Sequence, residues 1–233
     1  MKLETLTQVN VERAARRPVI VITDTANGEQ RLVKAKDFAA DPLRAELAKQ
    51  LRMGKSGTVE AAGKKLFLNV YAPTAKLVIV GAVHISQALA PLARSLDYDV
   101  TVVDPRTAFA SPERFPDVPL VAEWPDVALP PLNVDHYTAF VAVTHDPKID
   151  DPALLHAFER DCFYIGALGS RKTHAKRAER LRAQGAKESD IARIHAPIGL
   201  AIGAVSPSEI AVAIMAEITA QLRLPPKEKE EAA

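Results

Sequence analysis

The sequence contains a single cysteine, Cys162, which excludes an intrachain disulfide and any metal or iron–sulfur site built from several cysteines. It has no excess of one charge, since 30 Lys and Arg face 29 Asp and Glu, whereas nucleic-acid-binding proteins are normally basic. No apolar run approaches the roughly 18 residues that a membrane span needs, and residues 1–17 lack the hydrophobic core of a signal peptide. These absences predict a cytoplasmic protein that neither inserts into membranes nor binds nucleic acid.

The rest of the composition is typical of a globular α/β protein. Hydrophobic residues make up 48% of the 233 positions, too many for a disordered chain. The length suits one large domain, or one of about 150 residues with a smaller companion. A change of pattern near residue 74 favours the second arrangement. We therefore predict a small α+β domain at 1–74, a larger domain at 75–224 and a flexible, Lys- and Glu-rich tail at 225–233.

The larger domain alternates apolar strands with helical patterns, which predicts βαβ units and a Rossmann-like parallel sheet. The small domain shows strands at 19–22 and 66–70 around a helix at 43–52. In the larger domain the expected strands are 77–80, 99–103, 139–143 and 162–165, and the expected helices are 84–96, 152–160, 171–184 and a last one from 206. For the second of these helices, Asp151 is the expected N-cap and Pro152 the first-turn residue. The last helix begins with a capping box, Ser206 to Glu209.

Glycines and polar residues follow each of four predicted strands. The four exits are 81–84 (GAVH), 104–106 (DPR), 144–146 (THD) and 166–172 (GALGSRK). In an open parallel sheet, ligands bind beyond the carboxyl ends of the strands, near the switch in strand order. The four exits together therefore predict one site, suited to a phosphate, a ribose or a polar ring.

The first exit resembles a dinucleotide-binding turn, in which helix N–H groups meet phosphate. Val83 stands where the second glycine of that pattern would be, which argues against standard NAD binding. Asp104 lies at the distance expected for a ribose-binding acid. A glycine turn at Gly81 that serves only the fold is equally compatible with this motif.

The fourth exit has the stronger phosphate signal. Ser170 can cap a helix whose first turn presents Arg171, so N–H groups, a helix dipole and a cation converge. Residues 171–193 contain eight Lys and Arg against three Asp and Glu. The cations beyond the first turn are expected on a solvated helix face: Lys176, Arg177, Arg180 and Arg182.

The histidines and the cysteine predict no catalytic or metal site. His84 and His145 stand at strand exits, where each could contact a ligand or serve the turn. No histidine pair has the i, i+4 spacing of a helical metal site, and neither a nucleophile elbow nor a P-loop occurs. Cys162 is expected to be a buried structural thiol at the opposite end of the sheet.

Six ordered segments resemble the XdhC/CoxI proteins, maturation factors of molybdenum hydroxylases. They cover nearly all of 75–222 and are 77–84 (LVIVGAVH), 102–106 (VVDPR), 144–147 (THDP), 164–171 (YIGALGSR), 196–203 (APIGLAIG) and 206–217 (SPSEIAVAIMAE). The resemblance implies a non-enzymatic chaperone that transiently binds the molybdenum cofactor, as molybdopterin or its dinucleotide. Such a chaperone would deliver it to an apo molybdenum hydroxylase of the xanthine dehydrogenase or carbon monoxide dehydrogenase type. The resemblance allows two further partners, a cysteine desulfurase and a paralogous maturation factor. It also allows the chain to form a homodimer.

The resemblance also implies which residues face the cofactor. The implied residues are Gly81, Ala82, His84, Asp104, Arg106, His145, Gly166, Gly169, Ser170 and Arg171. The chain departs from the family pattern at Val83, at Ala201 and at 56–60 (SGTVE), which lacks the family's cysteine and so excludes thiolate ligation by the small domain. Two alternatives remain open: an NAD(P)-dependent oxidoreductase, favoured by Asp104, and a cofactor-free assembly scaffold.

Overall fold

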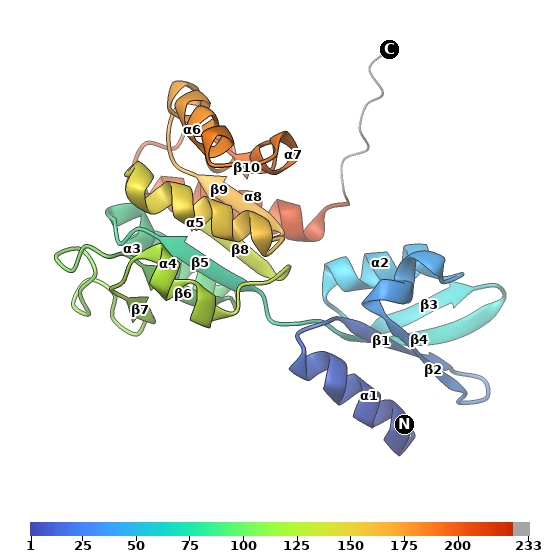
Figure 1. Ribbon diagram of the computed structural model, residues 1–233. Coiled ribbons are helices and arrows are strands. Elements are labelled where there is room, and N and C mark those ends of the chain that lie inside the picture. The colour runs from blue at the N-terminus through green and yellow to red at the C-terminus, as the bar shows by residue number, and fades with distance from the viewer. Residues whose placement is uncertain (226–233) are drawn as a thin grey trace, which may run out of the picture. The chain divides into compact units, whose positions relative to one another are not determined.

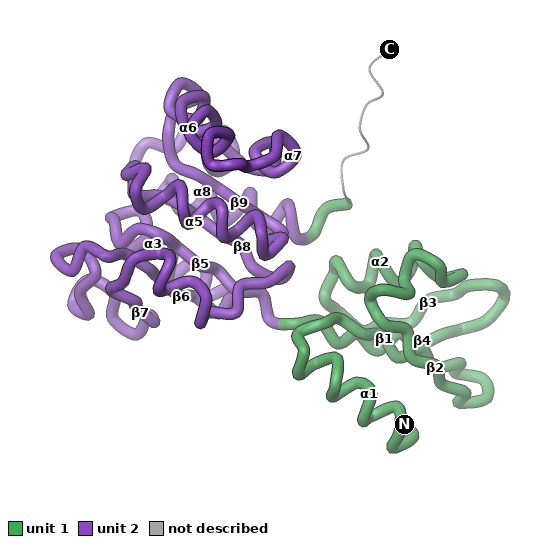
Figure 2. The backbone as a smooth tube through the Cα atoms, in the orientation of Figure 1, with its two compact units in different colours: residues 1–73, 223–233 green, residues 74–222 purple. Residues whose placement is uncertain are grey.

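The computed structural model describes residues 1–225, which form two compact units (Figures 1 and 2). Of the described residues, one unit comprises 1–73 and 223–225, and the other comprises 74–222. The flexible tail expected at 225–233 lies outside the described residues, except for Pro225.

The first unit is an antiparallel sheet with helices, as the α+β prediction requires. Its four strands lie in the order β2-β1-β4-β3. Its elements are α1 (Leu3–Ala14), β1 (Val19–Asp24), β2 (Gln30–Lys34), the 3-10 helix η1 (Ala35–Ala40), α2 (Arg44–Met53), β3 (Gly57–Ala61) and β4 (Lys64–Tyr71). Leu47 of α2 is buried against Ile20 and Leu68 of the sheet. The sequence does not predict the edge strands β2 and β3, because most of their side chains are only partly buried or exposed and they carry no apolar run.

The second unit contains a six-stranded sheet in the order β10-β9-β8-β5-β6-β7, with every neighbouring pair parallel. Its strands are β5 (Lys76–Val80), β6 (Asp99–Val103), β7 (Leu120–Val121), β8 (Thr138–Ala142), β9 (Tyr164–Ala167) and β10 (Ile194–His195). Its helices are α3 (His84–Ser95), α4 (Pro125–Ala128), the 3-10 helix η2 (Pro130–Leu132), α5 (Pro147–Glu159), α6 (Arg171–Ala183), α7 (Glu188–Ile191) and α8 (Pro207–Arg223). This topology confirms the Rossmann-like prediction.

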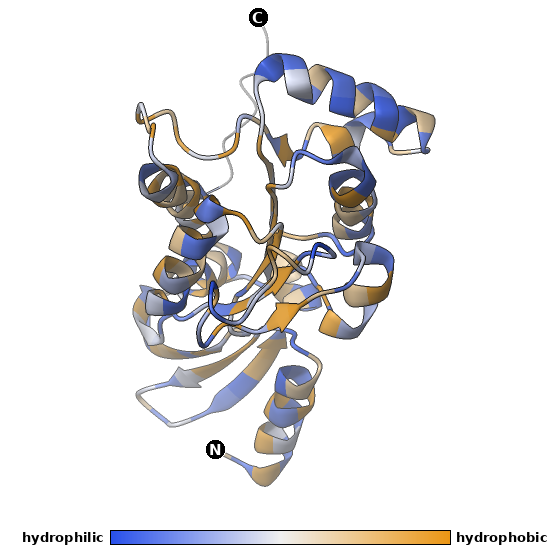
Figure 3. Cartoon of the chain, turned by 90° about the vertical axis from the view of Figure 1, so that its left-hand side faces the viewer, coloured by the Kyte–Doolittle hydropathy of each residue, from blue (hydrophilic) through white to orange (hydrophobic). Residues whose placement is uncertain are grey.

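Helices cover both faces of this sheet, and each face has its own core (Figure 3). Leu89 of α3 and Ile214 of α8 pack on one face, and Leu154 of α5 and Leu181 of α6 pack on the other. Since side chains of a strand alternate between faces, a strand covered on both sides must be apolar throughout. This explains the unbroken apolar run at 77–80.

Helix α8 begins as the sequence predicts, and α5 does not. The capping box is present, because the Glu209 N–H donates to Ser206 Oγ (3.3 Å) and the Ser206 N–H donates to Glu209 Oε2 (2.8 Å). Helix α5 begins five residues earlier than expected, at Pro147, where Asp146 is the N-cap. Asp151 therefore lies inside the helix and does not cap it. The local pattern is ambiguous here, because Pro147 and Pro152 both follow an aspartate.

Candidate functional site

The four predicted exits lie at one edge of the parallel sheet. They follow β5, β6, β8 and β9, and all of these strands run in the same direction. The chain leaves β5 for β6 on one side and returns through β8 on the other, so β5 and β8 form the topological switch point. We call residues 81–84, 104–106, 144–146 and 168–171 the carboxyl rim.

The first exit packs closely against the third, where Gly81 meets Thr144. Gly81 has a φ of +120°, and a Cβ there would lie 2.9 Å from Thr144 Cγ2 and 3.2 Å from the Thr144 nitrogen. Only glycine permits both this backbone conformation and this approach. His84 is exposed as the first residue of α3, and Val83, at the N-cap position, has no side-chain oxygen to accept from the first-turn N–H groups. Those groups therefore lack a side-chain cap and can meet an anion.

Asp104 joins the first and second exits. Its side chain is fully buried, and Oδ2 accepts hydrogen bonds from the Ala82 N–H (2.7 Å) and Arg106 Nη2 (2.8 Å). Oδ1 accepts from the Arg106 backbone N–H and Nε, both at 2.9 Å. Burial would raise the pKa of Asp104, but these hydrogen bonds outweigh it and hold the pKa below its ordinary value. With both oxygens engaged inside the protein, Asp104 orients Ala82 and Arg106 and is not available to a ribose hydroxyl.

Arg106, in the second exit, is stabilised as a cation by several acidic side chains. The hydrogen-bonded Asp104 carboxylate raises the pKa of Arg106, and the charges of Asp146 and Asp150 raise it further. The guanidinium also lies over the Phe109 ring, 4.6 Å from its centroid. Because Asp104 neutralises it, Arg106 adds little net positive charge to the carboxyl rim.

The third exit is held by Asp150, which the sequence did not single out. This carboxylate is 2% exposed and accepts from Thr144 Oγ1 (2.6 Å), the Thr144 N–H (3.3 Å) and the His145 N–H (3.1 Å). Burial raises the pKa of Asp150 above its ordinary value. His145 is exposed and has a φ of +65°, in the left-handed region. The signal that could have revealed Asp150 is its place in the first turn of α5, from which its side chain reaches back to the exit.

The fourth exit has the predicted cap. Ser170 Oγ accepts from the Thr173 N–H at 3.2 Å, and the exposed Arg171 is the first residue of α6. Gly169 has a φ of +134°, with Thr173 Cγ2 only 3.0 Å from where its Cβ would be. Gly166 has a different place, because it is buried inside β9 and a Cβ would lie 2.5 Å from Ile198 Cδ1. Its lack of a side chain serves packing, and it is not part of the carboxyl rim.

The sequence suggested that the cations of α6 beyond its first turn lie on a solvated face, but two of them do not. Arg177 is 2% exposed, and its Nη2 donates to the Leu168 carbonyl at 2.7 Å. Its Nε and Nη1 have no hydrogen-bond partner within residues 1–225. Arg180 forms a bidentate ion pair with Asp151, at 2.6 and 2.9 Å. Arg180 reaches Asp151 of α5 because that helix packs beside α6, and the two helices share a buried core.

Two cavities lie away from the carboxyl rim. One of about 1100 Å³ belongs to the first unit and includes Ile22, Asp24 and Arg31 in its lining. The other, about 280 Å³, lies at the amino edge of the parallel sheet and includes Cys162. That thiol is buried, as predicted, and burial raises its pKa to about 12. Among the helices of residues 1–225, none has the length and hydropathy of a membrane span.

Comparison with known proteins gives three kinds of match. A family model described as the XdhC Rossmann domain matches residues 77–218. The chain is 33% identical over 175 residues to the uncharacterized protein YqeB of Escherichia coli (strain K12), covering 72% of this chain and 32% of YqeB. It is 32% identical to a probable xanthine dehydrogenase subunit from Bacillus subtilis (strain 168), covering 66% and 44%. It is 30% identical to the molybdenum cofactor insertion chaperone PaoD of E. coli, covering 66% and 42%.

The likeness to a solved structure concerns the fold. The crystal structure of a xanthine dehydrogenase from Bacillus halodurans gives a TM-score of 0.68 at 23% identity, covering 94% of this chain and 67% of that one. The matched parts of the three curated relatives amount to between 32% and 44% of their own length. The chain thus matches less than half of each curated relative.

Proposed function

This chain belongs to the XdhC family, and we propose that it is a cytoplasmic maturation chaperone that transiently binds the molybdenum cofactor at the carboxyl rim. It delivers the cofactor to an apo molybdenum hydroxylase, of the xanthine dehydrogenase or carbon monoxide dehydrogenase type, or assists assembly of its active site. The name of the relative PaoD, a molybdenum cofactor insertion chaperone, supports this role. A cysteine desulfurase or a paralogous maturation factor would be a second partner.

The observation that carries the proposal is the presence of two helix N-termini at one sheet edge. Helix α3 follows β5 and has no side-chain cap, and α6 follows β9 and presents Arg171. Only β8 lies between these strands, so the strands are two spacings, about 10 Å, apart. Each helix N-terminus offers N–H groups and a partial positive charge to an anion. A phosphorylated pterin, or its dinucleotide, has the charge and length to meet both.

The residues of the carboxyl rim have different roles in this proposal. Gly81 and Ala82 allow the backbone to approach the cofactor, with His84 beside them. Gly169, Ser170 and Arg171 hold phosphate. Asp104 fixes Arg106, and Asp150 fixes the turn that presents His145.

The two buried carboxylates that bond to the carboxyl rim support a carrier better than an enzyme. Asp104 and Asp150 are buried and bonded to backbone N–H groups or to Arg106, so neither is placed to exchange a proton with a substrate. The engagement of Asp104 also removes the main argument for the nicotinamide-dependent alternative. The cofactor brings the molybdenum chemistry, and the chain supplies binding and release.

The test is anaerobic mixing of the full chain with mature molybdenum cofactor, then gel filtration and analysis of pterin and molybdenum in the protein fraction. We expect Arg171→Glu to lower retention at least ~10-fold, because it replaces an attractive charge with a repulsive one. Arg182→Glu is the matched control, on the same helix about 16 Å further along its axis. Circular dichroism should show that both variants fold.

Three outcomes would count against the proposal. Equal retention by Arg171→Glu and the wild type would remove the phosphate role of the fourth exit. Co-purification with an apo-hydroxylase without pterin would favour the scaffold alternative. Saturable NADH binding, followed by nicotinamide fluorescence, would favour the oxidoreductase.

A further inference from the structure

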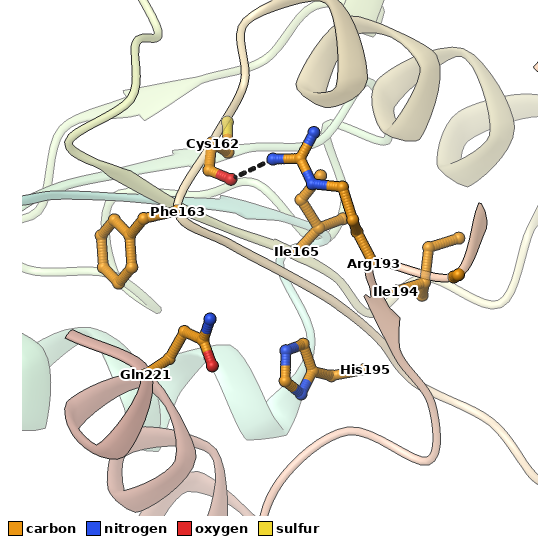
Figure 4. Close-up of a pocket in the computed structure, with 8 residues that line it drawn as sticks. Cys162, Phe163, Ile165, Arg193, Ile194, His195 and Gln221 are labelled. Atoms are coloured by element: carbon orange, nitrogen blue, oxygen red, sulfur yellow. Dashed lines mark hydrogen bonds between the residues drawn. The ribbon is translucent and has the colours of Figure 1, made fainter. Parts of the chain in front are cut away.

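The smaller cavity, at the amino edge of the parallel sheet, contains a polar cluster that the proposed function does not use. It has a volume of about 280 Å³ and lies where β9 and β10 begin (Figure 4). The two strands pair only at Ile194 with Ile165 and at His195 with Gly166. The residues just before these pairs line the cavity from both chain segments, Cys162 and Phe163 on one and Ala192 and Arg193 on the other. We call it the amino-edge pocket.

One wall of the amino-edge pocket is an imidazole held in a fixed orientation. His195 Nδ1 lies 3.1 Å from Glu217 Oε1, and the ring stacks on Tyr164 with the centroids 4.6 Å apart. Glu217 Oε2 accepts from the Tyr164 hydroxyl (2.6 Å) and from the Gly199 N–H (2.8 Å). Burial would raise the pKa of Glu217, but hydrogen bonds from His195, Tyr164 and Gly199 outweigh it and keep the pKa below its ordinary value. Glu217 is therefore ionised at neutral pH.

The ionised carboxylate decides which ring nitrogen carries a proton. A carboxylate only accepts hydrogen bonds, so Nδ1 of His195 must donate to it. In the neutral ring, Nε2 then has a free lone pair and accepts a hydrogen bond. The Glu217 contact thus prepares His195 Nε2 to meet an O–H or N–H group.

Other polar groups of the amino-edge pocket are suited to a carboxylate. Arg193 Nη2 donates to the Cys162 carbonyl (2.6 Å) and lies 2.9 Å from Asp161 Oδ1, whose side chain is 70% exposed. An ion pair to so exposed an acid is weak and easily exchanged. Gln221 extends from α8 toward the same space as His195 (Figure 4). A guanidinium and an amide are both donors that carboxylates prefer.

We propose that the amino-edge pocket binds a small hydroxy- or amino-carboxylate. The ligand carboxylate meets Arg193 and Gln221, and its O–H or N–H group donates to His195 Nε2. The volume is just below that of pockets for drug-sized ligands, roughly 300 Å³ and upward, so the ligand is small. This site is separate from the carboxyl rim and does not depend on the molybdenum cofactor.

The test compares glycolate with acetate, two carboxylates of similar size of which only glycolate carries a hydroxyl. Each is titrated into full-length protein with ¹⁵N-labelled histidine while the His195 ring signals are followed by NMR. We expect glycolate to bind about fivefold more tightly, the value of one ordinary hydrogen bond. In His195→Phe, whose ring can still stack on Tyr164, this preference should vanish when binding is followed on backbone amide signals.

Two further variants keep the outcome interpretable. Gln221→Leu changes an exposed side chain and should weaken both anions about equally without affecting the fold. His84→Phe, at the carboxyl rim, should leave both affinities unchanged. If neither anion moves the His195 signals, or if acetate binds as tightly as glycolate, the proposal is wrong. It is also wrong if His84→Phe weakens binding as much as His195→Phe does.

Discussion

The two edges of the parallel sheet use buried carboxylates in different ways. At the carboxyl rim, Asp104 and Asp150 bond to N–H groups and side chains of the rim itself, and this fixes the loops. At the amino edge, Glu217 bonds to Tyr164 and His195, and His195 lines the amino-edge pocket. The buried acids at the carboxyl rim thus fix loop backbone, whereas Glu217 fixes a side chain that lines the amino-edge pocket. Substitutions of the acids should therefore act on stability at the rim.

The largest expected effect is that of removing Asp104. Asp104→Ala should lower the free energy of unfolding by about 3 kcal/mol, because it leaves Arg106 and the Ala82 N–H without their partner. Urea unfolding at pH 7 measures the loss. Asp99→Ala, at the exposed start of the same strand, is the matched control and should change stability by less than about 0.5 kcal/mol. Equal losses in the two variants would show that the Asp104 contacts contribute nothing specific.

The next effect tests how closely the first exit approaches the third. Gly81→Ala should cost about 2 kcal/mol, because it adds a clash with Thr144 to an unfavourable φ. Gly185→Ala is the control, since Gly185 has a φ of +91° in the same unit but nothing within 4 Å of its Cβ position. It should cost only about 1 kcal/mol. If urea unfolding gives the same loss for both, the contact with Thr144 does not constrain the switch point.

The elements that could be predicted from the sequence are those with strong local patterns. The strand at 77–80 is apolar, and the strand at 99–103 is largely so, because both faces of the sheet are covered, and their predicted bounds agree almost to the residue. The caps Ser170 and Ser206 are also predictable, since a cap is a contact across three residues. The two-residue strands β7 and β10 are too short to form a pattern.

Contacts between distant parts of the chain could not be predicted in this way. The sequence indicated that Asp104 lies at a strand end, but not that its carboxylate is hydrogen-bonded to the Arg106 side chain. The sequence places Glu217 in the last helix, whereas the fold brings that residue to Tyr164 and His195, 53 and 22 positions earlier. Each of these pairings depends on which strands are neighbours, and local periodicity does not contain that information.

Substitutions of Ser170, the cap of α6, distinguish an effect on stability from an effect on anion binding at the carboxyl rim. Ser170→Ala should cost about 1 kcal/mol, because the Thr173 N–H loses its acceptor. Ser170→Asp keeps an acceptor there and should cost less than about 0.5 kcal/mol, yet its charge should repel a bound phosphate. Under the proposed function, Ser170→Asp therefore retains stability in urea and loses cofactor in the anaerobic assay. Ser206→Asp, the same change at the start of α8, should keep both, and a loss of cofactor there would remove the argument.

The smallest expected effect concerns pH, and it distinguishes Asp104 from Asp150, the two buried acids that bond to residues of the carboxyl rim. The pKa of Asp104 is lowered, so its stabilising contribution is present above the ordinary pKa near 3.8 and is lost as the pH falls below it. The pKa of Asp150 is raised, so the folded state takes up a proton before the unfolded state does. Wild-type stability should thus rise relative to Asp150→Asn as the pH falls from 7 through that raised pKa, by about 1 kcal/mol or less. Urea unfolding at pH 7, 5 and 4 measures the difference. A fall in wild-type stability relative to Asp150→Asn on acidification would mean that the Thr144 and His145 hydrogen bonds outweigh burial, and Asp104 and Asp150 would then depend on pH in the same way.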